Sequence, residues 1–479
     1  MDSIEIFLFC SFTLFVFYIL LPFIQPSILK VAIYVINLPL IFFLSLGSLL
    51  FVTYKQDISM LQIAQMNKNM YPGWALELSF YTLGAYCFTL ITLAIKPSFV
   101  SRITLPSIRF DLISPRHINR YIFLVLAIVM VLCLPHWFSI GINKTGLYSI
   151  LTLSPQSYLS SREASIKLTD SALTLAFYSY GVLISNFLYP ILLWRLCSSI
   201  THFSRSIYGA VLLLLVLVTN IQGARAGFFQ PITIGFLTLF FCDIHSIRSN
   251  MVDSLAALVT RGNLHFSLLK KLVFVFLLCS IFLVLVTSLS VLVSTSVYDK
   301  WLIQRMLESI IHRVLSVQFY TGPINIFLVD SLQIGFENFF GGFPGASLIL
   351  GDNPGIFQLT GEYSEYYFNN LIGDTNNLNT SGLFLNAAFW GPLGFAVYTF
   401  NIIVNLLVFS ILSRKSFAAS STSSRYTSFP SLLSFNALVV LSMLAWEMPS
   451  SVITVFPVMW ILAWLLARLY CFALRLRLR

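Results

Sequence analysis

The sequence predicts an all-α polytopic membrane protein with about eleven transmembrane helices and one large extracytoplasmic loop. Hydrophobic residues make up 58% of the 479-residue chain and charged residues only 10%, whereas soluble domains average about 45–50% and 25%. The mean hydropathy is +0.86. Apolar runs of about 20 residues recur along the chain, and this is the length that a helix needs to cross a bilayer. These observations exclude a soluble globular protein.

Eleven apolar segments are long enough to be spans. The first has neither a basic start nor a small-residue cleavage site, so we expect a retained helix and not a signal peptide. Two segments, 206–221 and 226–243, are short and share a tight joint, and a Gly-Pro pair at 391–392 interrupts the ninth. The expected spans are residues 3–24, 30–53, 74–95, 121–140, 172–194, 206–221, 226–243, 272–294, 383–413, 431–447 and 452–473.

The spans divide the chain into three parts. Residues 1–294 carry eight spans, residues 295–382 form a polar loop, and residues 383–479 carry three spans and a basic tail. The loop holds 10 of the 23 glycines and thirteen Phe and Tyr residues. Loops of this length are usually functional or disordered, and the aromatic content argues against disorder. We therefore expect this loop to carry the activity.

The distribution of Lys and Arg predicts the orientation. With the C-terminal tail in the cytoplasm, the inside loops carry 19 of the 28 Lys and Arg residues and the outside segments carry nine. Inside loops of membrane proteins have this bias, so we expect an outside N-terminus, a cytoplasmic C-terminus and an extracytoplasmic loop. The pI of about 9.2 then reflects contact with anionic membrane lipids and not with nucleic acid.

An arginine at the joint between the two short spans is a candidate anion site. Arg225 lies in the stretch GARAG, where small neighbours allow a bulky ligand to approach the backbone. The helix that follows would direct its N-terminus to the same place, and a guanidinium there suits a diphosphate. The alternative is an arginine that only extends to the membrane interface.

Residues 299–320 have the pattern of an amphipathic helix. Arg305 and His312 fall on one stripe, with Glu308 and Arg313 on its flanks. Such a helix lies in the membrane interface with a solvated polar face, or it lines a cavity beneath the loop. In the second case Arg305 and Arg313 would complete a cationic site, and His312 would act as a base oriented by Glu308.

The loop ends in a dense set of carboxylates, amides and tyrosines. Amide and carboxylate groups satisfy sugar hydroxyls, and tyrosine rings offer flat apolar surfaces. The set therefore favours carbohydrate binding, although single asparagines also form turns. Neither HExxH, Asp-x-Asp nor a cysteine cluster occurs, so we expect no metal and no other cofactor. The members are Glu362, Tyr363, Glu365, Tyr366, Tyr367, Asp374, Asn376 and Asn377.

In the order of these features the chain resembles the bacterial O-antigen and oligosaccharide repeat-unit polymerases (Wzy-type), the enterobacterial common-antigen polymerases and the related O-antigen ligases. The matching stretches are GARAG around Arg225, the large loop, and NTSGLFLNAAFWGPLG at residues 379–394. The resemblance implies a metal-independent membrane glycosyltransferase with a GT-C-like fold in the bacterial inner membrane. Its active site would face the periplasm.

The resemblance also implies a substrate and partners. The enzyme would join undecaprenyl-diphosphate-linked oligosaccharide units into O-antigen or a related surface polysaccharide, with a polysaccharide chain-length regulator as a partner. Arginines would stabilise the diphosphate leaving group; the candidates are Arg225, Arg162, Arg313 and Arg305. A carboxylate or histidine would activate the acceptor hydroxyl; the candidates are Glu362, Glu365, Asp374 and His312. The glycan would contact Tyr363, Tyr366, Tyr367, Asn376 and Asn377.

Three other functions remain open. An O-antigen ligase, which transfers the glycan to a lipid core, differs only in its acceptor. A flippase for lipid-linked oligosaccharides would need a polar path through the spans, and few charges fall in mid-span. A non-catalytic component of the same glycan pathway is the third.

Overall fold

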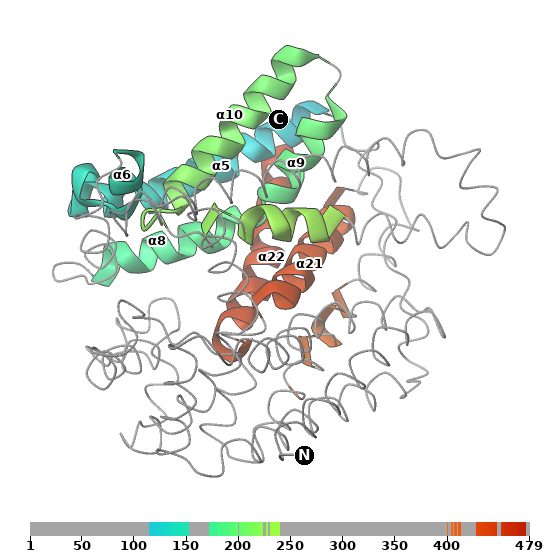
Figure 1. The fold of residues 1–479 in the computed structure, drawn as a ribbon. Coiled ribbons are helices and arrows are strands. Elements are labelled where there is room, and N and C mark those ends of the chain that lie inside the picture. Colours follow the sequence, from blue (N-terminus) through green and yellow to red (C-terminus); the bar gives the residue numbers. More distant parts are fainter. Residues whose placement is uncertain are drawn as a thin grey trace, which may run out of the picture. The chain divides into compact units, whose positions relative to one another are not determined.

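The computed structural model describes residues 115–152, 172–199, 201–223, 227–228, 230–239, 428–447 and 452–475, and scattered residues between 400 and 412. All regular structure in these residues is helical (Figure 1). Three helical stretches in them are long and apolar enough to cross a membrane, Ile118–Ile140, Leu173–Ser198 and His202–Thr219. For this part of the chain, the prediction of an all-helical fold is confirmed, and three of its helical stretches have the length and composition of membrane spans.

The helices occupy six of the expected spans. They are α5 (Pro115–Ile140), α8 (Ala172–Ser185), α9 (Tyr189–Ser198), α10 (His202–Thr219), a helix of residues 227–228 and 230–239, α21 (Ser428–Glu447) and α22 (Val452–Arg475). A short 3₁₀ turn, η2 (Ile142–Lys144), and α6 (Gly146–Leu151) follow α5. The expected spans 3–24, 30–53, 74–95 and 272–294 lie outside the described residues, as do most of span 383–413 and both predicted domain boundaries.

Nearly all described residues belong to one compact unit. It includes the described residues between 115 and 239, together with 409–443 and 458–475. Residues 400–408, 444–447 and 452–457 belong to a second unit. All contacts given below lie within the first unit.

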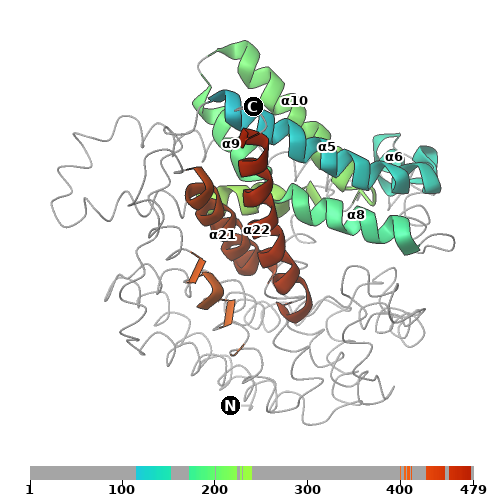
Figure 2. The ribbon, with the colours of Figure 1, turned by 180° about the vertical axis from the view of Figure 1, so that it is seen from behind.

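Helices α5 and α8 pack side by side because a glycine lets their backbones approach (Figure 2). A Cβ atom at Gly181 would lie 2.5 Å from Cys133 Sγ and 3.2 Å from Leu132 Cβ. Val125, Val129 and Cys133, spaced one turn apart, are all 0% exposed. Small residues at helix contacts are typical of membrane bundles, where close packing replaces the hydrophobic effect.

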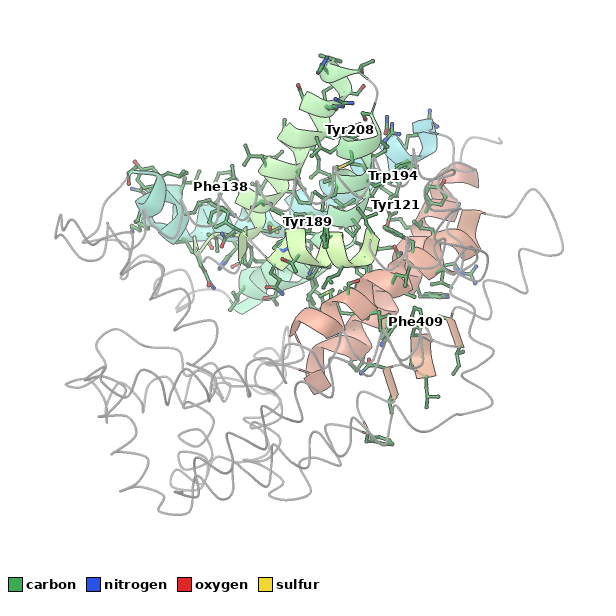
Figure 3. All side chains as sticks on the ribbon, turned by 45° about the vertical axis from the view of Figure 1, so that its right-hand side comes forward. Tyr121, Phe138, Tyr189, Trp194, Tyr208 and Phe409 are labelled. Atoms are coloured by element: carbon green, nitrogen blue, oxygen red, sulfur yellow. The ribbon has the colours of Figure 1, made fainter. Side chains whose placement is uncertain are left out.

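The opposite face of α5 is apolar and exposed. Phe123 is 74% exposed, Val131 72% and Phe138 69%, and Figure 3 labels Phe138 near one end of the helix. Large apolar side chains on an outward face are expected where a helix meets lipid. The burial pattern of α5 therefore agrees with a membrane span.

The expected span 172–194 is interrupted. Residues 186–188 form turns between α8 and α9, and Pro190 stands in the first turn of α9, where its missing N–H costs no helical hydrogen bond. Two buried side chains satisfy the freed carbonyl of Val182: Ser185 Oγ donates to it at 2.6 Å and Asn186 Nδ2 at 3.3 Å. The break is thus stabilised by hydrogen bonds within the span.

Helix α9 is covered by α10 and by the helix of residues 227–239. Leu193, Cys197 and Leu239 form a buried cluster against which Leu212 of α10 packs. A Cβ atom at Gly235 would lie 2.5 Å from Leu193 Cδ1, so the helix of residues 227–239 crosses α9 at close range. Figure 3 shows Tyr189 and Trp194, both on α9, in this region.

Helix α21 is buried on all sides over residues 432–443, which is expected for a helix at the centre of a bundle. Its polar side chains make interhelical hydrogen bonds: Asn436 Nδ2 donates to Ala463 O at 3.0 Å, and Ser442 Oγ accepts from Thr238 Oγ1 at 2.9 Å. Such bonds stabilise helix association in membranes. They connect α21 to α22 and to the helix of residues 227–239.

Candidate functional site

The described chain that precedes Arg225 in the sequence is a tight turn, residues 220–223, that follows α10. The N–H of Asn220 donates to Leu217 O at 3.3 Å, and the N–H of Gly223 donates to Asn220 O at 3.0 Å. Gly223 has a φ of 62°, the left-handed region that glycine enters without the steric cost of a Cβ. The sequence Gln222-Gly223 therefore permits the reversal that precedes Arg225.

A tyrosine on α8 holds this turn by two hydrogen bonds. The hydroxyl of Tyr178 donates to Thr219 O at 2.6 Å and accepts from the N–H of Ile221 at 3.0 Å. Tyr178 is 8% exposed. The last carbonyls of a helix have no partner within the helix, so this hydroxyl satisfies one of them and links it to the turn.

Three further elements bond to the same region. Trp137 Nε1 on α5 donates to Val218 O at 2.8 Å. The N–H of Leu147 on α6 donates to Ile221 O at 3.1 Å. On α9, the Tyr189 hydroxyl lies 2.9 Å from Thr219 Oγ1. Since these hydrogen bonds come from α5, α6 and α9, three separate elements hold the end of α10 and the turn in place.

A buried histidine lies behind Tyr178. His136 is 0% exposed, its ring centroid is 5.0 Å from that of Tyr178, and its Nδ1 lies 3.4 Å from Thr174 Oγ1. The histidine therefore restricts the orientation of the Tyr178 ring. Neither residue stands out in the sequence, because an aromatic residue in a span is ordinary in a chain with 15% aromatic content.

After Arg225 in the sequence, a second glycine, Gly227, lies against a buried side chain. A Cβ atom at Gly227 would overlap the side-chain amide of Asn220, with Asn220 Cγ at 2.5 Å. Asn220 is 3% exposed. The described residues on both sides of the segment 224–226 are thus in contact, whereas that segment lies outside the described residues.

The candidate residues taken from the sequence all lie outside the described residues, and their roles stay predictions. For the diphosphate they are Arg225, Arg162, Arg313 and Arg305; for catalysis Glu362, Glu365, Asp374 and His312; and for the glycan Tyr363, Tyr366, Tyr367, Asn376 and Asn377.

The side chains that bond to residues 219–221 and to Val218 are polar and uncharged. They supply hydroxyl and indole groups, which can orient a segment or bind a neutral ligand. Glu447 is the single carboxylic acid in the described residues. Within the same residues no group of three or more His, Cys, Asp or Glu side chains lies together. The hydrogen bonds to residues 218–221 hold the backbone in place up to the point where the chain leaves Gly223.

No protein-family model, curated protein or solved structure matches the chain.

Proposed function

We propose that the chain is a membrane glycosyltransferase that polymerises undecaprenyl-diphosphate-linked oligosaccharide units into O-antigen or a related surface polysaccharide. It would act at the outer face of the bacterial inner membrane, with eleven spans, a GT-C-like architecture, an outside N-terminus and a cytoplasmic C-terminus. The observation that carries the proposal is the 220–223 turn, which Tyr178 holds and which ends two residues before Arg225 in the sequence.

A rigid turn at this place favours a catalytic arginine over one that only reaches for the membrane surface. Stabilising charge in a transition state requires donors that are already in position. An arginine at an interface needs no fixed backbone, because its long side chain adapts. Hydrogen bonds from Tyr178, Trp137 and Leu147 fix the backbone of residues 218–221. A fixed backbone is needed by an arginine that stabilises transition-state charge and is not needed by one that only reaches the interface.

The proposed reaction needs no metal. The terminal hydroxyl of an incoming lipid-linked unit attacks the anomeric carbon of the growing chain. The bond from that carbon to the carrier diphosphate breaks, and the diphosphate leaves with its electron pair. Arg225, with Arg162, Arg305 or Arg313, neutralises the charge that develops there. The hydroxyl proton passes to a base, for which the candidates are Glu362, Glu365, Asp374 and His312.

The second candidate is a flippase for the same lipid-linked units. It is favoured by the break at residues 186–188, because transporters often bind their cargo at discontinuous spans. Ser185 is 1% exposed and Asn186 4%, so polar groups do occur within this span. Both side chains bond to Val182 O, which supports a structural role for them and ranks the flippase second.

Analysis of the lipid-linked glycans in a bacterial strain that lacks this chain distinguishes a polymerase from a ligase and a flippase. A polymerase predicts that long chains disappear while single units still reach their final acceptor. A ligase predicts that no glycan is transferred and that long chains stay on the carrier lipid. A flippase predicts that single units accumulate on the cytoplasmic face. Either of the last two results would overturn the proposal.

A further inference from the structure

At the end of the bundle opposite to the 220–223 turn, the neighbouring ends of α5, α9 and α10 each carry an arginine. Arg120 lies near the start of α5, Arg195 near the end of α9 and Arg205 near the start of α10. Each is within about two turns of the end of a candidate span. No Asp or Glu occurs in residues 115–152, 172–199 or 201–223, so no carboxylate in these stretches offsets the charge.

Hydrogen bonds place these helix ends on one side of the bundle. The Tyr208 hydroxyl on α10 donates to Asn119 Oδ1 on α5 at 2.8 Å. Tyr208 also accepts from Arg195 of α9, and Arg205 Nε donates to Ser199 O at 2.7 Å. Figure 3 shows Tyr208 and Trp194 in this region. The arginines therefore share one surface where the spans leave the membrane.

Arg195 is held in one orientation. Its Nε and Nη2 donate to the same Tyr208 hydroxyl at 3.1 and 2.8 Å. Its Cζ lies 5.0 Å from the centroid of the Tyr208 ring and 5.6 Å from that of Trp194. A guanidinium has five N–H donors, so these bonds use one edge of the group and leave the Nη1 edge to a ligand.

The surroundings of Arg195 also fit the membrane interface. Phe203, one residue into α10, is 77% exposed, and Trp194 is partly buried beneath the guanidinium. Aromatic residues are enriched at the level of the lipid headgroups, where a ring contacts acyl chains and polar groups together. A ligand at this depth is therefore expected to have an anionic head and an apolar body.

From this charge complementarity we propose that the surface formed by Arg120, Arg195 and Arg205 binds the phosphate of an anionic phospholipid. The Nη1 edge of Arg195 donates to the phosphate oxygens, because a guanidinium that is already oriented loses little freedom on binding. Arg120 and Arg205 add to the electrostatic attraction, each by about fivefold in affinity. The acyl chains lie against the exposed apolar faces of α5 and α10. The inference does not depend on the proposed function.

Native mass spectrometry of the purified full chain tests this site. The protein is incubated with equal amounts of phosphatidylglycerol and phosphatidylcholine, and the retained lipid is measured. We expect the wild type to retain phosphatidylglycerol selectively and Arg195→Gln to reduce this retention about fivefold. Tyr208→Phe, which keeps the charge but removes the hydroxyl that orients it, should give a smaller loss.

The matched control is Arg468→Gln. Arg468 on α22 is exposed, whereas Arg195 is half-buried, and like Arg195 it lies over a tryptophan, 5.1 Å from the Trp464 ring centroid. We expect this variant to retain phosphatidylglycerol as the wild type does. Equal losses for Arg195→Gln and Arg468→Gln would mean that the lipid only follows net charge, and the site would not exist.

The melting temperature of the wild type provides a test without any substitution. We expect phosphatidylglycerol to raise it and phosphatidylcholine to leave it unchanged, because only a ligand that binds the folded state stabilises it. If millimolar inorganic phosphate raises it equally, the surface binds free phosphate and the lipid proposal is wrong. If none of the three raises it, no anion site is present and the proposal is also wrong.

Discussion

Replacing Tyr178 by phenylalanine removes the hydroxyl that holds the 220–223 turn. Two backbone groups lose their partner, the Thr219 carbonyl at 2.6 Å and the Ile221 N–H at 3.0 Å. A net hydrogen bond contributes about 0.5–1.5 kcal/mol, and a buried group left without a partner costs about 1–3 kcal/mol. Interhelical bonds in a membrane protein average about 0.6 kcal/mol. We therefore expect Tyr178→Phe to lower the free energy of unfolding by about 1–3 kcal/mol.

The assay is equilibrium unfolding of the purified protein in mixed micelles, with Tyr121→Phe as the matched control. Tyr121 on α5 is 2% exposed; within the described residues its hydroxyl makes no hydrogen bond of standard geometry, and the Asn436 side chain on α21 is its polar neighbour. Since a buried hydroxyl without a partner costs about 1–3 kcal/mol, removing it should leave the stability unchanged or raise it. If both variants unfold at the same denaturant concentration as the wild type, Tyr178 does not hold the turn.

The same comparison separates a structural from a functional effect. If the turn positions Arg225, Tyr178→Phe should shorten the glycan chains in cells, whereas Tyr121→Phe should not. In an Arg225→Ala background Tyr178→Phe should cause no further loss of chain length, because residues that act as one unit are not additive. A full additional loss in that background would show that Tyr178 acts through another group.

Further predictions concern packing, charge and topology. Gly181→Ala should destabilise the protein by about 1–3 kcal/mol, because its Cβ would lie 2.5 Å from Cys133 Sγ; Cys133→Ala should restore stability in the double variant, and failure to do so in thermal melts would refute this contact. Arg225→Ala should lower the polymerisation rate about 10²-fold or more and Arg225→Lys nearly as much, because the two-pronged contact is lost; wild-type chain lengths in either variant would contradict the role. A reporter fused after Arg479 should be active only in the cytoplasm and one inserted near Asp352 only outside, and the opposite result at either point would reverse the orientation.

The helical spans could be predicted because their signal is local. An apolar run of span length specifies a helix in a membrane, and α5, α10, α21 and α22 begin and end within a few residues of the expected limits, apart from the extension of α5 to Pro115. The break between α8 and α9 also has a local cause: Pro190 has no N–H to donate to the Asn186 carbonyl, and in a continuous helix its ring would clash with that carbonyl. The span prediction for 172–194 did not use that signal.

The contacts around the 220–223 turn could not be predicted in the same way. Tyr178 is separated from Ile221 by 43 residues and Trp137 from Val218 by 81, and nothing in the local pattern distinguishes these aromatic residues from others in a span. Their partners depend on how α5, α8 and α10 pack, which follows from close contacts such as that of Gly181 with Cys133. Arg195 is similar: its charge is visible in the sequence, whereas its orientation by Tyr208 is a property of the fold.

The central claim is that this chain by itself joins lipid-linked oligosaccharide units. The most direct measurement places the purified protein in proteoliposomes with undecaprenyl-diphosphate-linked repeat units and a chelator, and follows product length by gel electrophoresis. We expect a ladder of lipid-linked chains that persists without divalent metal and is lost with Arg225→Ala. The proposal would be contradicted if the folded wild-type protein left the single units unjoined under conditions in which a known polymerase makes chains.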